Sequence, residues 1–233
     1  MSNKKLEFRP AQNDDYRTRI KICGITKLDD ARFASGAMAD YLGFIFSDKS
    51  ARYVEPDVAR EIISWIEGPE TVGVFVDHPA DDVNDIIEKT GIHYVQLHGN
   101  EPPEYCALMD RPIIKAFRVK ADMSEQDILE MIKPYERTVE FFLFDSFDEA
   151  QHGGTGKQFD WNIVREVSKI YPVFLAGGIG TLNVRRAIRL VEPYAVDISS
   201  SLEMAPGIKD FDKMNEFFDE MREIWDEQET DAQ

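Results

Sequence analysis

The sequence is poor in cysteine and histidine, with two and four residues respectively in a chain of 233. The cysteines, Cys23 and Cys106, form no Cys-x-x-Cys pair and no Cys/His spacing that is typical of a zinc site. These absences argue against a disulfide framework, and we expect no metal site. A cysteine with a functional role must therefore act as a free thiol, and Cys106, within a helix-like stretch, is interpreted as packing.

Long hydrophobic runs are also missing. No apolar run approaches the roughly 18 to 20 residues that cross a bilayer. The first residues include basic side chains but lack the apolar segment of a secretory signal. We therefore expect a cytoplasmic protein without a membrane partner.

Positive charge is scarce. The 27 lysines and arginines face 44 acidic residues, which gives a formal net charge of −17. This balance repels nucleic acids and anionic lipids, so we expect no nucleic-acid partner. The acidic residues gather in helix-like segments and near the C-terminus, where they are interpreted as solvated surface.

Short β-branched or aromatic runs alternate eight times with longer amphipathic stretches. The length suits a single domain. Start signals for helices are Asp57, Asp81, Ser124 with Asp127, and Thr181. The connections are long enough for right-handed crossovers, so the strands should be parallel. The predicted strands are residues 19–23, 40–46, 71–76, 93–97, 112–117, 140–145, 172–176 and 194–199.

Eight such units fit either a closed barrel or an open doubly wound sheet. No G-x-G-x-x-G motif follows the first strand, where a dinucleotide-binding open sheet would place it. Glycine-rich turns instead follow the last three strands, as in barrels that bind phosphate. The sequence predicts an α/β protein with a single-domain (β/α)8 TIM barrel over residues 18–226, preceded by a flexible extension (1–17) and followed by an acidic tail (227–233).

Catalytic residues of such barrels lie where the strands end. The first predicted strand ends in Cys23 and the sixth in Asp145, while the loop after the second carries Lys49 and Arg52. Loops 176–180 and 199–207 contain glycines and serines whose amides and hydroxyls can bind phosphate. Loop 153–157 is also glycine-rich but lacks the spacing of a P-loop.

Side chains alternate between the two faces of a strand, and this alternation predicts which residues point into the barrel. Lys21 has the parity of Cys23 and should point inward, where it needs an ion pair with Asp197 or Asp145. Gln96 and His98 share a parity at the end of the fourth strand and should line the pocket mouth. His98 is interpreted as a hydrogen-bonding scaffold residue.

At each predicted strand end, from KICGIT (21–26) through FLFDS (142–146) to VDISS..E..PGIKD (196–210), the sequence resembles the phosphoribosylanthranilate isomerases of tryptophan biosynthesis, and the resemblance covers residues 19–215. The similarity follows every predicted strand end in order, so it is more specific than any single motif. It implies a cofactor-free Amadori rearrangement of a small-molecule substrate, N-(5-phosphoribosyl)anthranilate, to 1-(2-carboxyphenylamino)-1-deoxyribulose 5-phosphate. The matching segments are KICGIT (21–26), GFIFSDKSARYV (43–54), VGVFVD (72–77), VQLHGNE (95–101), FLFDS (142–146), GGTGKQFDW (153–161), LAGGI with NV (175–179, 183–184) and VDISS..E..PGIKD (196–210).

The resemblance also implies roles for individual residues. Cys23 matches the general base and Asp145 the general acid, while Arg52 matches the arginine that holds the anthranilate carboxylate. A thiolate at Cys23 would need help from a positive charge, with Lys21 or Arg52 as candidates. The backbone around four residues matches the phosphate cradle: Gly177, Gly178, Ser199 and Ser200.

Two residues depart from the family pattern. Ala51 replaces a proline, which should loosen the loop that carries Arg52. Ser201 replaces a glycine, which either strains the phosphate loop or adds a hydrogen-bond donor. Competing hypotheses are a related barrel such as indole-glycerol-phosphate synthase or ribulose-phosphate 3-epimerase, and a non-catalytic phosphate binder. The oligomeric state, monomer or homodimer, stays open.

Overall fold

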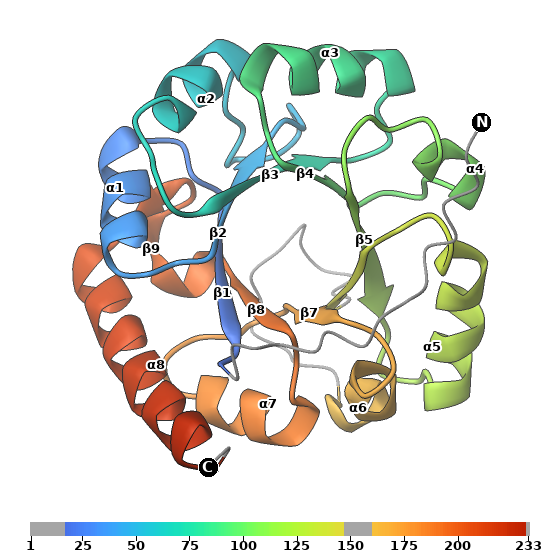
Figure 1. The fold of residues 1–233 in the computed structure, drawn as a ribbon, viewed down its shortest axis with the longest axis vertical. Coiled ribbons are helices and arrows are strands. Elements are labelled where there is room, and N and C mark those ends of the chain that lie inside the picture. Colours follow the sequence, from blue (N-terminus) through green and yellow to red (C-terminus); the bar gives the residue numbers. More distant parts are fainter. Residues whose placement is uncertain (1–16, 147–159, 232–233) are drawn as a thin grey trace.

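The protein was analysed as a computed structural model, which describes residues 17–146 and 160–231. The eight predicted strands form a closed barrel in chain order, with every neighbouring pair parallel (Figure 1). The predicted (β/α)8 barrel is confirmed. The strands are β1 (Arg19–Cys23), β2 (Tyr41–Ile45), β3 (Glu70–Phe75), β4 (Tyr94–Leu97), β5 (Ile113–Val119), β6 (Phe141–Ser146), β7 (Val173–Leu175) and β8 (Ala195–Ile198).

The helices surround the ring of strands (Figure 1). They are α1 (Leu28–Gly36), α2 (Pro56–Ile63), α3 (Ala80–Thr90), α4 (Pro103–Cys106), α5 (Glu125–Ile132), α6 (Asn162–Ser168), α7 (Val184–Val191) and α8 (Phe211–Asp231). Two short 3-10 helices, η1 (Lys133–Tyr135) and η2 (Ser200–Leu202), follow α5 and β8. After η2, the antiparallel strands β9 (Glu203–Ala205) and β10 (Ile208–Lys209) form a small hairpin before α8.

The predicted start of α5 is confirmed. The side chain of Ser124 accepts a hydrogen bond from the backbone N–H of Asp127, and the backbone N–H of Ser124 donates to the carboxylate of Asp127. The start signals at Asp57, Asp81 and Thr181 are each wrong by two residues, because prolines at positions 56 and 79 begin or precede two of these helices and turns precede the third. The first helical residues are Pro56, Ala80 and Val184.

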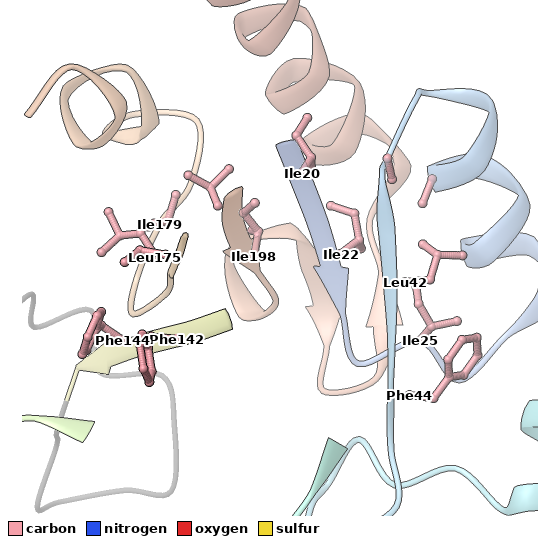
Figure 2. Close-up of a cluster of buried hydrophobic side chains, with 14 of the residues drawn as sticks. Ile20, Ile22, Ile25, Leu42, Phe44, Phe142, Phe144, Leu175, Ile179 and Ile198 are labelled. Atoms are coloured by element: carbon pink, nitrogen blue, oxygen red, sulfur yellow. The ribbon is translucent and has the colours of Figure 1, made fainter. Parts of the chain in front are cut away.

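Alternation along the strands divides the core into two layers. Ile20 and Ile22 on β1 and Leu42 on β2 belong to the larger layer, between the strands and the helices (Figure 2). Residues of opposite parity fill the barrel interior. This smaller layer comprises Tyr41, Val72, Ile114, Ala116, Phe141, Leu143, Phe174, Ala176 and Ala195, with Tyr94 and Tyr194 packed against it.

Aromatic rings fill the amino end of the barrel interior. Each lies at or near the start of its strand, and neighbouring ring centroids are 4.9–5.9 Å apart. We call them the aromatic layer: Tyr41, Tyr94, Phe141, Phe174 and Tyr194. Since this layer packs the amino end with side chains, a ligand site must lie at the opposite, carboxyl end.

The two ends of the described chain lie against the barrel. Arg17 pairs with Asp40 at 2.5 Å and stacks over Trp225 on α8 at 4.6 Å. Gln228 donates a hydrogen bond to Thr18, so α8 stays docked beyond residue 226 and the acidic tail begins within a helix. Residues 1–16 of the predicted extension lie outside the described residues. In the described ranges, no helix has the length and apolar character needed to cross a membrane.

Candidate active site

Lys21 and Cys23 project from β1 into the barrel at its carboxyl end. The Nζ atom of Lys21 lies 2.8 Å from Oδ2 of Asp197 on β8, and the lysine side chain has no exposed surface. Parallel register explains the pair, because Lys21 and Asp197 are direct neighbours across β1 and β8. The predicted ion pair is therefore confirmed, with Asp197 rather than Asp145 as the partner.

The thiol of Cys23 is 7% exposed and faces a space left by Gly43 on β2. A Cβ atom at position 43 would lie 2.8 Å from Sγ, so glycine is required for the thiol to occupy this position. Burial raises the pKa of Cys23 above its ordinary value, and Asp197 raises it further, whereas the charges of Lys21 and Lys209 lower it. Lys21, one of the two candidates from the sequence, is thus among the cations that favour the thiolate, and Lys209 is another.

Asp145 ends the inward-facing row of β6 and lies beside His98. Oδ2 of Asp145 is 3.5 Å from Nε2 of His98, and the two side chains are 31% and 19% exposed. The amide nitrogen of Gln96 lies 2.9 Å from Nδ1 of His98. These two contacts hold the imidazole ring of His98 between Gln96 and Asp145. Gln96 and His98 therefore support the acidic residue, in agreement with the predicted scaffold role.

Arg52 reaches the carboxyl end from the loop after β2. Its stem passes Gly24, where a Cβ atom would lie 2.8 Å from Cδ of Arg52 and 3.3 Å from Oγ of Ser199. Its guanidinium binds Glu203 on β9, with Nε at 2.8 and 3.1 Å and Nη2 at 2.7 Å from the carboxylate oxygens. These bonds do not use Nη1. Arg52 thus lies near the end of β1, but oriented by a carboxylate that the sequence reasoning did not assign.

Lys209 on β10 is the other residue that sequence reasoning missed. Its buried Nζ donates to the carbonyl oxygen of Cys23 at 2.6 Å and to that of Ser199 at 3.1 Å, and lies 3.2 Å from Oε1 of Glu203. The signal for both residues was the segment E-x-x-P-G-x-K. Its Pro-Gly turn closes a hairpin, and the register of that hairpin sets Glu203 opposite Lys209.

The predicted phosphate loops lie at the same end. Gly177 and Gly178 have positive φ angles of 89° and 70°, a conformation that strains other residues. A Cβ atom on Gly177 would also meet the backbone nitrogen of Ser146 at 2.6 Å. Ser199 follows β8 and Ser200 begins η2. The four residues of the predicted cradle are therefore brought to one end of the barrel, whereas loop 153–157 lies outside the described residues.

Of the two alternatives expected for Ser201, the structure shows the added hydrogen-bond donor and not the strain. It is not among the described residues with positive φ, and its hydroxyl donates to the carbonyl of Ile179 at 2.5 Å. A Cβ atom at Gly180 would lie 2.9 Å from Cβ of Ser201, so the glycine makes room for the serine. The loosening expected from Ala51 stays a prediction.

Charge at this end differs from that of the whole chain. Lys21, Arg52 and Lys209 pair with only two carboxylates, those of Asp197 and Glu203. These three cations and two carboxylates sum to one positive charge, and the carboxyl group of Asp145 lies at the same end, inside a protein of net charge −17. Among residues 17–146 and 160–231, no group of His, Cys, Asp and Glu side chains could hold a metal ion.

A carboxyl group and a thiol at the mouth of a (β/α)8 barrel, beside glycine-rich loops, define an enzyme of acid-base chemistry on an anionic ligand. Residues 20–220 match the sequence model of the family described as N-(5'phosphoribosyl)anthranilate (PRA) isomerase. The chain belongs to this family, and it is an isomerase of tryptophan biosynthesis.

Individual relatives agree with the family match. The N-(5'-phosphoribosyl)anthranilate isomerase of Geobacter metallireducens is 46% identical over 202 residues, which cover 85% of this chain and 96% of the relative. The crystal structure of the phosphoribosyl anthranilate isomerase from Thermotoga maritima has a TM-score of 0.80 and 37% identity, covering 88% and 99% of the two chains. Another solved isomerase, with a TM-score of 0.77, 35% identity and coverage of 88% and 99%, is a complex with reduced 1-(o-carboxyphenylamino)-1-deoxyribulose 5-phosphate.

Proposed function

We propose that the chain converts N-(5-phosphoribosyl)anthranilate to 1-(2-carboxyphenylamino)-1-deoxyribulose 5-phosphate, with Asp145 as general acid and Cys23 as general base. The observation that carries these roles is their placement. Both side chains occupy inward positions at the carboxyl ends of β6 and β1, in the part of the barrel that also holds Lys21, Arg52 and Lys209.

The first step opens the furanose ring. Asp145 donates a proton to the ring oxygen as the bond from this oxygen to C1′ breaks, and the lone pair of the anthranilate nitrogen forms a C=N bond. His98 supports this step because its Nε2 lies beside Oδ2 and leaves Oδ1 of Asp145 to carry the transferred proton.

The second step moves a proton from carbon to the thiolate of Cys23. Cys23 removes the proton from C2′, the electrons of that bond form a C1′=C2′ bond, and the C=N electrons return to nitrogen. The resulting enolamine loses its hydroxyl proton and gains one at C1′, which gives the ketone. Lys21 supports the base, since its ammonium group favours the thiolate over the buried thiol.

Substrate binding uses both ends of the site. The phosphate lies against the backbone of Gly177 and Gly178 and the start of η2 at Ser199 and Ser200, while Arg52 binds the anthranilate carboxylate through its Nη1 edge. Oδ1 of Asp197 is buried with no hydrogen-bond partner among the described residues. This oxygen is therefore an acceptor for a ribose hydroxyl.

The test follows the decay of anthranilate-type fluorescence from enzymatically generated substrate. Wild type turns over, whereas Cys23→Ser and Asp145→Asn each lower kcat/KM by about 10²- to 10⁴-fold, the usual contribution of a positioned acid or base. Cys106→Ser is the matched control and retains full turnover. Activity that survives both active-site substitutions contradicts the mechanism. No turnover by wild type would favour a non-catalytic phosphate binder.

A further inference from the structure

We infer that Glu203 and Lys209 are positioning residues that set the orientation of Arg52 and its distance from the phosphate loop. This inference rests on the proposed function. Neither residue touches a reacting atom in the proposed mechanism, and both belong to the β9–β10 hairpin, which follows the phosphate loop directly.

Glu203 determines which edge of the Arg52 guanidinium faces a ligand. It holds Nε and Nη2 through three bonds of 2.7–3.1 Å, so the group cannot rotate without breaking them. Although burial favours its neutral form, the hydrogen bonds of Arg52 and the charge of Lys209 hold the pKa of Glu203 below its ordinary value. The carboxylate therefore stays charged and keeps its hold on Arg52 at neutral pH.

Lys209 connects this pair to both ends of the site. Its ammonium group binds Glu203, the carbonyl of Cys23 at the end of β1 and the carbonyl of Ser199 at the end of β8. The three N–H donors of Lys209 thus have three separate partners. They are Glu203, which orients Arg52, Cys23, the base on β1, and Ser199 in the phosphate loop. A shift of Lys209 would change the distances among all three.

Stability alone does not account for these buried charges. A buried ion pair is on average no more stabilising than apolar side chains of the same volume, because desolvation offsets the attraction. The hairpin nevertheless brings a lysine that is 3% exposed and a glutamate that is 7% exposed to the mouth of the site. Their geometry serves a polar function, which is to hold a guanidinium toward an anion.

The charge of Lys209 also acts on Cys23. The charged groups that face this thiol are Lys21 on β1, Asp197 on β8, Lys209 on β10 and the guanidinium of Arg52. Lys209 opposes the effect of burial on the pKa of Cys23. Removing it raises this pKa, so the rise of kcat/KM with pH moves to higher pH.

The experiment compares wild type with Glu203→Gln and Lys209→Met, and Lys213→Met is the matched control. Lys213 is in the same segment, but its Nζ donates only to the backbone carbonyl of Glu203 within this cluster, at 2.7 Å. For each variant we measure kcat, KM, the pH profile of kcat/KM, the melting temperature, and inhibition by two probes. Anthranilate reports on the carboxylate subsite and inorganic phosphate reports on the phosphate subsite.

Glu203→Gln is expected to raise KM and the anthranilate inhibition constant by about tenfold, the loss of one charge-assisted hydrogen bond, with phosphate inhibition unchanged. Lys209→Met raises the inhibition constants of both anthranilate and phosphate and moves the pH profile of kcat/KM to higher pH. Lys213→Met changes none of these quantities. Should Lys209→Met fail to fold, Lys209→Arg keeps the charge and restores the pH profile but not the distances, so both inhibition constants still rise.

The inference is overturned if Glu203→Gln leaves the inhibition constant of anthranilate unchanged. It is also overturned if Glu203→Gln raises the inhibition constants of anthranilate and phosphate equally and lowers the melting temperature. The second pattern is what a purely structural ion pair produces. Failure of the proposed function gives a different result, since wild type would then show no turnover while the probe measurements could still be made.

Discussion

The two ends of the barrel interior are built from different chemistry. At the amino end, the aromatic layer packs ring against ring, and Arg19 lies over the ring of Tyr194 at 4.5 Å. At the carboxyl end, the inward side chains are a thiol and charged groups, and glycine-containing loops surround them. Both ends belong to the same eight strands, so the difference arises from the side chains at each end and from the loops and the β9–β10 hairpin that follow the strands at the carboxyl end.

This difference separates stability from activity. Buried aromatic rings contribute apolar area and favourable ring geometry without unsatisfied polar groups. Buried charges at the other end require partners, and one buried oxygen of Asp197 has none among the described residues. The aromatic end therefore stabilises the barrel, while the polar end holds reactive groups at a cost in stability that the rest of the fold offsets.

The largest effect on stability alone is expected from Phe174→Ala. Phe174 is fully buried, and its ring centroid lies 5.2, 5.3 and 5.7 Å from those of Tyr41, Phe141 and Tyr194. Loss of this ring should lower the free energy of unfolding by about 3 to 5 kcal/mol, measured by urea denaturation. The control Leu108→Ala, at a site 58% exposed, should change it by no more than about 0.5 kcal/mol.

If the two ends are functionally separate, the Phe174→Ala enzyme that remains folded at low temperature has the kcat/KM of wild type. A fall in kcat/KM comparable to that of Cys23→Ser would show that the aromatic layer also shapes the active site, and the comparison would fail.

The carboxyl end should respond to pH. Burial raises the pKa of Cys23, so the thiol is protonated at neutral pH and the thiolate fraction grows as pH rises. Below that pKa, the thiolate fraction should increase by about tenfold per pH unit, whereas kcat/KM rises with it only while Asp145 keeps the proton that it donates. The measurement uses initial rates from pH 6.5 to 9, with the substrate-generating enzyme in excess.

The matched measurement is the rate of Cys23 alkylation by iodoacetamide in a Cys106→Ser background. It should increase by about tenfold per pH unit, because alkylation depends on the thiolate alone, whereas kcat/KM also depends on protonated Asp145. An alkylation rate that is already maximal and flat from pH 6.5 would contradict the raised pKa of Cys23.

The fold was predictable because its signals are local. Each strand is a run of β-branched or aromatic residues bounded by helix-period segments, and Ser124 caps α5 with groups three residues apart. The Lys21–Asp197 pair was also predictable. Inward parity on two strands that neighbour each other in a closed barrel left few partners for a buried ammonium group.

The arrangement around Arg52 was not predictable in the same way. Its partner, Glu203, lies 151 positions away and meets it only because the β9–β10 hairpin lies beside the loop after β2. No periodicity encodes such an approach. The glycines were informative only as turn signals, whereas the structure shows that Gly24 and Gly43 make room for Arg52 and the thiol of Cys23.

The smallest expected effect concerns a single hydrogen bond of the aromatic layer. The hydroxyls of Tyr41 and Tyr194 are 3.0 Å apart, and burial together with this hydrogen bond holds the pKa of Tyr41 far above its ordinary value. Tyr41→Phe should lower the free energy of unfolding by about 0.5 to 1.5 kcal/mol in urea denaturation. Because Tyr41 stays protonated, this loss should be the same at pH 6 and pH 9.

Tyr194→Phe is the matched variant, since it removes the other half of the same hydrogen bond. The double variant should lose no more stability than either single one, because the bond can be broken only once. kcat/KM should stay at the wild-type value in all three. Additive losses would show that each hydroxyl has a separate partner, and reduced turnover would show that the amino end communicates with the site at the opposite end of the barrel.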